Sequence, residues 1–305
     1  MYAFTTLDQQ ALHQARSRTA LLTIVIFAGM VTVLYLCGRL VIGDDAMLVA
    51  FAVVTLMALL TVQPSVGLVM RMNHAMPIST QEAPELYAEL FELARRAGLT
   101  ICPTLYYQPS AGINAFAVVG RHDDAAIALS NGAFRFLSRS ELVSVLAHEV
   151  AHIAAGDTRM MSLGAVLIRV TQGVAMVGLL ASLLLLFLSG DPDAAPIETT
   201  VLLSLATPAV LFLYLALSRN REFAADLMAA RLTGDAIGLA RALQKIDQDG
   251  SASGSSHPLL RTHPKTAERV ANLLRNVRMV SPFTIQHMLL PAVRTRASLA
   301  RSSIV

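Results

Sequence analysis

The sequence predicts a mostly helical α+β protein in which four transmembrane α-helices carry a soluble domain with a small sheet. Hydrophobic residues make up 54% of the 305 residues and charged residues only 15%, and the mean hydropathy is +0.56. Soluble domains are about 45–50% apolar and about 25% charged. Four long apolar runs alternate with segments that have strand-like and helix-like patterns. This composition excludes a disordered chain and an ordinary soluble enzyme. The net charge of +3 is too small to indicate a nucleic-acid partner.

The four apolar runs have the length of membrane-spanning helices, which need roughly 20 residues. None of them contains Asp, Glu, Lys or Arg, and they cover residues 19–38, 46–70, 170–190 and 199–218. The third span is expected to begin earlier, near Ser162, with Arg169 close to the membrane interface. Four buried helices of a soluble core are the alternative, which is disfavoured because charge-free runs of this length are rare there.

Basic residues lie on one side of these spans, and the side with more Lys and Arg faces the cytoplasm. The loop 189–198 holds three acidic residues and no Lys or Arg, whereas arginines lie at the opposite ends of the spans: Arg16, Arg18, Arg71, Arg159, Arg219 and Arg221. The sequence therefore predicts an integral, multi-pass membrane protein with both termini cytoplasmic. The expected parts are a cytoplasmic segment 1–18, a membrane hairpin 19–70, a cytoplasmic part 71–161, a second hairpin 162–218, and a cytoplasmic part 219–305 with a basic tail.

The cytoplasmic parts show the expected soluble elements in order. Residues 84–98 have apolar residues at helical spacing, with Pro84 at the start and Gly98 at the end. Short strands are expected at 104–107, 115–119 and 125–130. Ser138 and Glu141 form a capping box that opens a helix reaching Gly156. Further helices are expected from Arg219 to Gly234, at 235–247 and at 266–278, with a flexible connector at 248–257.

The helix that follows the capping box carries the sequence His148-Glu149-Val150-Ala151-His152, an H-E-x-x-H pattern. Residues four apart share one helix face, so both imidazoles can bind one Zn²⁺. Glu149 is too close to the first histidine to join them, but its carboxylate can take a proton from a water that zinc activates. Surface residues of an unrelated helix are the alternative interpretation of this pattern.

A catalytic zinc needs a third protein ligand, and Glu222 is the best candidate because it follows the fourth span on the same side of the membrane. Asp226 lies one turn further and can accept the ring N–H of a zinc histidine, which would make it an outer partner of the metal. Alternatively, Glu222 pairs with Arg219 or Arg221 at the membrane surface.

Taken together, these motifs resemble the HtpX-like membrane zinc metalloproteases. HEVAHIAAGD (148–157), SRNREFAAD (218–226), residues 114–117 and THPKTAER (262–269) occur in the family's order around four spans. The resemblance implies a zincin-like metalloprotease domain with one Zn²⁺ held by His148, His152 and Glu222, and with Glu149 as the base. It also implies polypeptide substrates, the degradation of misfolded or damaged membrane proteins, and a place in the bacterial inner membrane.

Two further sites follow from the same resemblance. His263 is expected to stabilise the oxyanion that forms during cleavage, a role that needs a donor aimed at developing charge; a surface loop histidine is the alternative. Asn114, Ala115 and Phe116 are expected to bind substrate, because an edge strand of the sheet can pair with an extended peptide. For Asn114, an ordinary turn residue is the alternative.

Two other functions are open from the sequence. A zinc-binding pseudoprotease or membrane scaffold would bind metal without cutting, although the intact Glu149 argues against it. A metal transporter is disfavoured, because a transporter would place ionisable residues within its spans and these spans have almost none.

Overall fold

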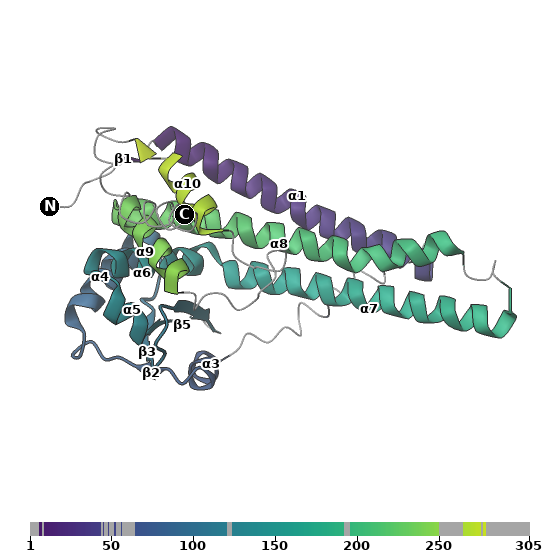
Figure 1. The fold of residues 1–305 in the computed structure, drawn as a ribbon, viewed down its shortest axis with the longest axis horizontal. Helices are drawn as coiled ribbons and strands as arrows, with labels where there is room; N and C mark the ends of the chain where they lie inside the picture. Colours follow the sequence, from purple (N-terminus) through teal and green to yellow (C-terminus); the bar gives the residue numbers. More distant parts are fainter. Residues whose placement is uncertain are drawn as a thin grey trace, which may run out of the picture.

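The computed structural model joins a bundle of long helices to a domain of shorter helices and strands at one end of the bundle (Figure 1). It describes residues 6–7, 9–43, 65–120, 124–191, 196–249, 265–275 and 277–278, together with Asp45, Leu48, Ala52 and Leu56.

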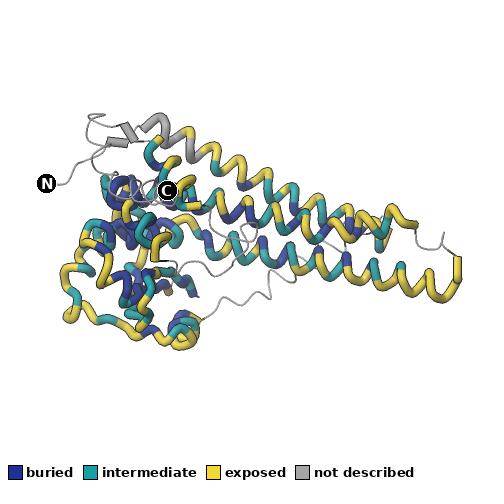
Figure 2. Tube along the Cα trace, in the orientation of Figure 1, coloured by how far each residue is buried: buried dark blue, intermediate teal, exposed yellow. Residues whose placement is uncertain are grey.

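Three helices in the described part of the chain are long and apolar enough to cross a membrane: α1 (Gln9–Ile42), α7 (Asp157–Ser189) and α8 (Ile197–Thr233). They pack against one another through buried Met30, Leu34, Leu167 and Val210. Their outer surface stays exposed along most of the bundle (Figure 2), and its large exposed side chains include Leu183 and Phe187. An apolar exterior of this extent suits lipid rather than water.

The second predicted span, residues 46–70, lies mostly outside the described residues, so the described chain has three candidate spans and not four. Its last residues are described, and there the prediction is wrong. Ser65 has an extended backbone, and a separate short helix, α3 (Val66–Met72), follows it. Val66 and Met70 of α3 are buried against the sheet. An apolar run alone does not distinguish a helix in lipid from one that packs on a sheet.

The sheet has four strands in the order β2-β3-β5-β4. The three predicted strands are confirmed as β3 (Thr104–Gln108), β4 (Ala115–Val119) and β5 (Ala125–Ser130), and β2 (Met76–Pro77) is an addition of two residues. β3 and β5 are parallel, while β2 and β4 are antiparallel to their neighbours. Another antiparallel pair joins β1 (Thr6–Leu7) to β6 (Val277–Arg278).

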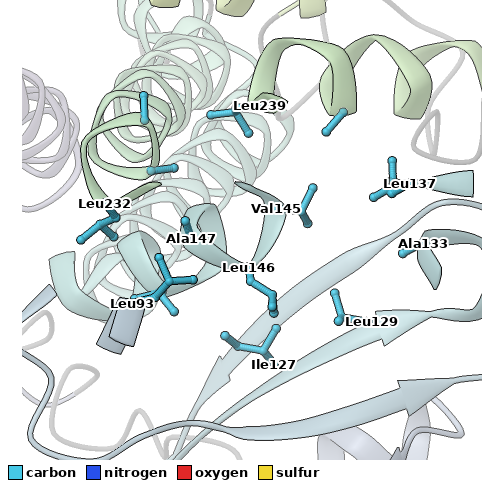
Figure 3. Packing of buried hydrophobic residues seen from close by; sticks show 14 of the residues in the cluster. Leu93, Ile127, Leu129, Ala133, Leu137, Val145, Leu146, Ala147, Leu232 and Leu239 are labelled. Atoms are coloured by element: carbon cyan, nitrogen blue, oxygen red, sulfur yellow. The ribbon is translucent and has the colours of Figure 1, made fainter. Parts of the chain in front are cut away.

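Helices cover both faces of this sheet. Side chains alternate between the two faces along a strand, and β5 is buried along its whole length, so its apolar residues contact helices on both sides. Ile127 and Leu129 of β5 face the main core, where Leu146 of α6 (Arg139–Ala155) and Leu93 of α4 (Pro84–Ala97) meet them (Figure 3). Ala126 and Ala128 face α3 on the other side. The remaining helices of the domain are α5 (Asn131–Phe136), α9 (Ala236–Asp249) and α10 (Thr266–Arg275).

The ends of α6 form as the sequence predicts. Ser138 and Glu141 make the capping box, and Gly156 ends the helix in a left-handed conformation with φ of +67°. However, α7 begins at the next residue, Asp157, and not near Ser162. A residue with a side chain is strained at such a φ, so Gly156 allows the sharp turn between α6 and α7.

The fourth span and the helix after it are one helix, which corrects the prediction of a new helix near Arg219. α8 runs without interruption from Ile197 to Thr233. The charged residues after Ser218 end the apolar run, but Arg and Glu are good helix formers and do not end the helix. Two smaller corrections are that α9 extends to Asp249, into the predicted connector, and that α10 ends at Arg275.

Candidate metal centre

His148 and His152 lie one turn apart on α6 and point their Nε2 atoms at each other. These two atoms are 3.1 Å apart, and the rings are nearly perpendicular, at 88° with centroids 4.6 Å apart. α6 is held in place by the main core under the sheet. The helical spacing of four therefore produces the paired imidazoles that the sequence predicts.

Glu222 of α8 completes a group of three ligand atoms. Its Oε2 lies 3.5 Å from Nε2 of His148, and its Oε1 lies 3.7 Å from Nε2 of His152. All three residues offer atoms within 4.8 Å of one another, and in the described part of the chain this is the group that could hold a metal ion. Ligands that bind one tetrahedral zinc at about 2.0–2.1 Å lie about 3.4 Å from each other. The observed distances and the two-nitrogen, one-oxygen donor set fit Zn²⁺.

A carboxylate faces the other ring nitrogen of each histidine. Oδ1 of Asp226 lies 3.1 Å from Nδ1 of His148, and Oδ2 of Asp157 lies 2.6 Å from Nδ1 of His152. A carboxylate accepts the Nδ1–H proton and leaves the Nε2 lone pair for a metal. Each histidine thus has an outer carboxylate of the kind that zinc ligands usually have.

Two arginines surround the carboxylates. Arg269 of α10 is buried and donates two hydrogen bonds to Asp226, at 2.8 and 2.6 Å. Its Nη1 lies 3.3 Å from Oε2 of Glu222. On the other side of the site, Arg221 donates to Asp157. The arginines thus connect α10 and α8 to the ligands and their partners.

The site carries an excess of buried negative charge. Four buried carboxylates, on Glu149, Asp157, Glu222 and Asp226, face the two guanidinium groups. Buried charge is costly unless a partner neutralises it. With both histidines neutral, as metal ligation requires, a divalent cation would balance the two remaining negative charges, which supports a metal at this position.

The electrostatics of His148 reflect this excess. Burial disfavours its charged form, but the hydrogen bonds to Asp226 and Glu222 outweigh burial and raise the pKa of His148 to about 10. Burial likewise opposes the charge of Arg269, while Asp226, Glu222 and Glu149 raise the pKa of Arg269 above its ordinary value. Glu149 therefore interacts electrostatically with Arg269 in the same cluster.

Of the predicted substrate residues, Ala115 and Phe116 begin β4, an edge strand, and Asn114 directly precedes it. In the described part of the chain β4 pairs with β5 alone. The N–H of Ser130 donates to the carbonyl of Asn114 at 3.0 Å, and opposed pairs alternate in an antiparallel ladder. The backbone groups of Ala115 and Ala117 therefore point away from β5. Asn114 is exposed, whereas Phe116 packs against the α3 side of the sheet.

His263 lies outside the described residues, so its predicted role is not addressed by the structure. The sequence interpretation gave Arg269 no role and named Arg221 only as an alternative ion-pair partner of Glu222. For Asp157 it suggested that the side chain orients a neighbour, without a catalytic duty, and the structure places this carboxylate at Nδ1 of His152. In the sequence each of them is only a charged residue within a motif, and nothing there shows that it packs on the site. Burial and pairing between distant segments are not visible in the sequence.

Comparison with known proteins gives consistent matches. A family model described as Peptidase family M48 matches residues 80–277. A Protease HtpX from Legionella pneumophila (strain Corby) is 31% identical over 273 residues, which cover 82% of this chain and 96% of that protein. A Protease HtpX homolog from Acaryochloris marina is 36% identical over 220 residues, 65% of this chain and 74% of that protein. The crystal structure of S. mikatae Ste24p has a TM-score of 0.49 at 20% identity, and covers 89% of this chain and 68% of that chain.

Proposed function

The chain belongs to peptidase family M48, the zinc metallopeptidases, and we propose that it is a membrane-bound endopeptidase that cleaves misfolded or damaged membrane proteins at the cytoplasmic face. The observation that carries this proposal is the cluster of His148, His152 and Glu222, in which each histidine has a carboxylate at its Nδ1.

The residues of the site divide the work of peptide hydrolysis. His148, His152 and Glu222 hold the metal. When bound, Zn²⁺ supplies Lewis-acid chemistry that activates water and polarises the substrate carbonyl. Glu149 accepts a proton from the water that attacks the carbonyl carbon. After the new C–O bond has formed, Glu149 passes this proton to the leaving amine as the C–N bond breaks. Asp226 and Asp157 keep the two imidazoles in the orientation and tautomer that ligation needs.

The substrate lies along the free edge of β4 as an added strand. The outward N–H and C=O groups of Ala115 and Ala117 supply the hydrogen bonds, a mode that depends little on substrate sequence. Asn114, at the start of the strand, contacts the substrate with its exposed side chain. His263 donates to the oxyanion, as the family resemblance implies. This mode favours extended, unfolded chains over folded ones.

The metal centre lies close to the bilayer, because two of the candidate membrane helices, α7 and α8, carry residues of the site. α7 begins at Asp157, and α8 carries Glu222 beyond the apolar part of the helix. A substrate anchored in the same bilayer therefore meets the site close to its own anchor. Both termini and the parts 71–161 and 219–305 lie in the cytoplasm, and the segment 1–18 precedes the first membrane hairpin. This hairpin ends before Ser65, because α3 packs on the sheet, and the second hairpin lies within α7 and α8.

Cleavage of an unfolded protein by the detergent-purified chain tests the function. We expect the protein to degrade casein, to lose this activity in a zinc chelator and to regain it when zinc is restored. Zinc bound at one ion per chain without cleavage of casein or of any membrane-anchored chain would instead indicate a pseudoprotease. A periplasmic signal from a reporter fused to the C-terminus would contradict the orientation.

A further inference from the structure

The short helix α3 has an apolar face that nothing in the described part of the chain covers. Leu68 is 57% exposed and Met72 is 73% exposed, and Met76 of the neighbouring β2 is 56% exposed. Large apolar side chains that gather on a surface mark a contact with a partner or a membrane. The opposite face of α3 is buried on the sheet through Val66 and Met70.

The position of α3 indicates which partner covers it. α3 lies at the end of the domain from which α7 leaves, at the same level along the bundle (Figure 1). It also follows directly on a long apolar run of the sequence, residues 46–64. Both observations bring the exposed face to the boundary between the membrane helices and the domain.

The charge of the segment suits an anionic lipid surface. Residues 65–81 contain no Asp or Glu, and the exposed Arg71 lies between Leu68 and Met72. Arginine near a membrane extends its stem along apolar surface and places its guanidinium among phosphates. Binding of a water-soluble protein would not require an apolar face and a basic residue directly after a long apolar run.

We propose that α3 lies in the interface of the cytoplasmic leaflet, with Leu68, Met72 and Met76 in contact with lipid and Arg71 among the phosphates. In this arrangement α3 is an interfacial anchor and not the end of a span. The side chains of its buried face pack on Val118 and Phe116 of β4. The edge strand that receives substrate is therefore held at the membrane surface.

This contact has a consequence for substrate choice, which rests on the proposed function. An extended chain that adds to β4 lies close to the lipid headgroups. The preferred substrates are then polypeptides with a flexible segment next to a membrane anchor, and soluble unfolded chains reach β4 without any help from the bilayer.

Tryptophan fluorescence tests the lipid contact, because the chain contains no Trp. Met72→Trp in full-length protein reconstituted into vesicles of phosphatidylcholine and phosphatidylglycerol gives a single reporter. Phe91→Trp is the matched control, since Phe91 is 53% exposed on α4, away from the bundle. We expect a blue-shifted emission from Met72→Trp that lipids brominated near the headgroup quench, and an emission from Phe91→Trp that they leave unchanged.

Two results would overturn the proposal. Equal emission and equal lack of quenching in the two variants would show that α3 faces water. A blue shift without quenching would show that a protein surface, such as a second copy of the chain, covers α3. Neither result depends on proteolysis, so the failure of this inference is distinguishable from failure of the proposed function.

The substrate consequence has its own measurement. Leu68→Glu combined with Met72→Glu is expected to slow the cleavage of a membrane-anchored substrate several-fold while casein cleavage is unchanged, with Phe91→Glu as control. Unchanged cleavage of both substrates by the double variant would contradict it.

Discussion

Oδ2 of Asp157, the first residue of α7, lies 2.6 Å from Nδ1 of His152, near the end of α6. The first turn of a candidate membrane helix thus orients a metal ligand, across a left-handed turn at Gly156. The helix that carries the two histidines, α6, and the candidate membrane helix α7 therefore both contribute residues to the metal centre.

Asp157→Asn is expected to weaken zinc binding by about 10- to 100-fold, as the loss of an outer partner of a ligand histidine typically does. The amide keeps the shape of the side chain but no longer favours the Nδ1–H tautomer of His152. Competition with a chelating dye measures the affinity. The exposed Asp247→Asn on α9 serves as control, and equal zinc affinity of the two variants would contradict the role of Asp157.

Arg269→Ala is expected to destabilise the protein by about 3–5 kcal/mol, because it leaves the buried carboxylate of Asp226 without its charged partner. Thermal unfolding in detergent, followed in zinc-free buffer, measures the loss. Arg275→Ala at the exposed end of the same helix should change the stability little. A similar, small effect of both substitutions would show that the buried pair of Arg269 and Asp226 contributes no stability.

Ala117→Pro is expected to raise KM for polypeptide substrates with little change in bound zinc. Proline removes an N–H that points to the free edge of β4, and an edge strand tolerates it. Ala117→Gly keeps the N–H and is the control. If both variants cleave casein with the KM of the wild type, substrate does not add to β4.

The ion pair of Glu141 and Lys245 makes stability depend on pH. Burial raises the pKa of Glu141, but the hydrogen bond from Lys245 at 2.6 Å outweighs burial and holds this pKa below its ordinary value of 4.5. A carboxyl with a lowered folded-state pKa stabilises the fold above its unfolded pKa and loses that contribution as the pH falls. Glu141→Gln should lower the melting temperature at pH 7, and the difference from wild type should shrink below pH 4.5. A difference independent of pH would rule out the ionised pair as its cause.

The sequence predicts the local features of this protein well. The capping box at Ser138, the strand at 115–119 and the metal-binding residues of α6 all depend on spacing within a few residues. The continuity of α8 was missed because a change from apolar to charged residues resembles a helix boundary. Local sequence patterns also do not predict that β4 lies at the edge of the sheet. β4 stands between β3 and β5 in the sequence, but in the sheet β5 pairs in parallel with β3 and β4 lies outside them.

The residues that surround the metal ligands are harder to predict from the sequence than the ligands themselves. Asp226 could be predicted from its place one turn after Glu222. Arg269, which meets Asp226 across 43 residues of chain, does not differ from an ordinary surface charge in its local sequence. Only the packing of α10 against α8 buries both and makes the pair energetically important.

Zinc content and cleavage, measured together in Glu222→Gln and Glu149→Gln, test the central claim most directly. We predict that Glu222→Gln loses most of its zinc and its activity, because the third ligand is removed. Glu149→Gln should keep one zinc per chain and lose cleavage of casein by about 10²- to 10⁴-fold, the usual contribution of a general base. A Glu222→Gln protein that keeps its zinc and cleaves casein like the wild type would contradict the site described here.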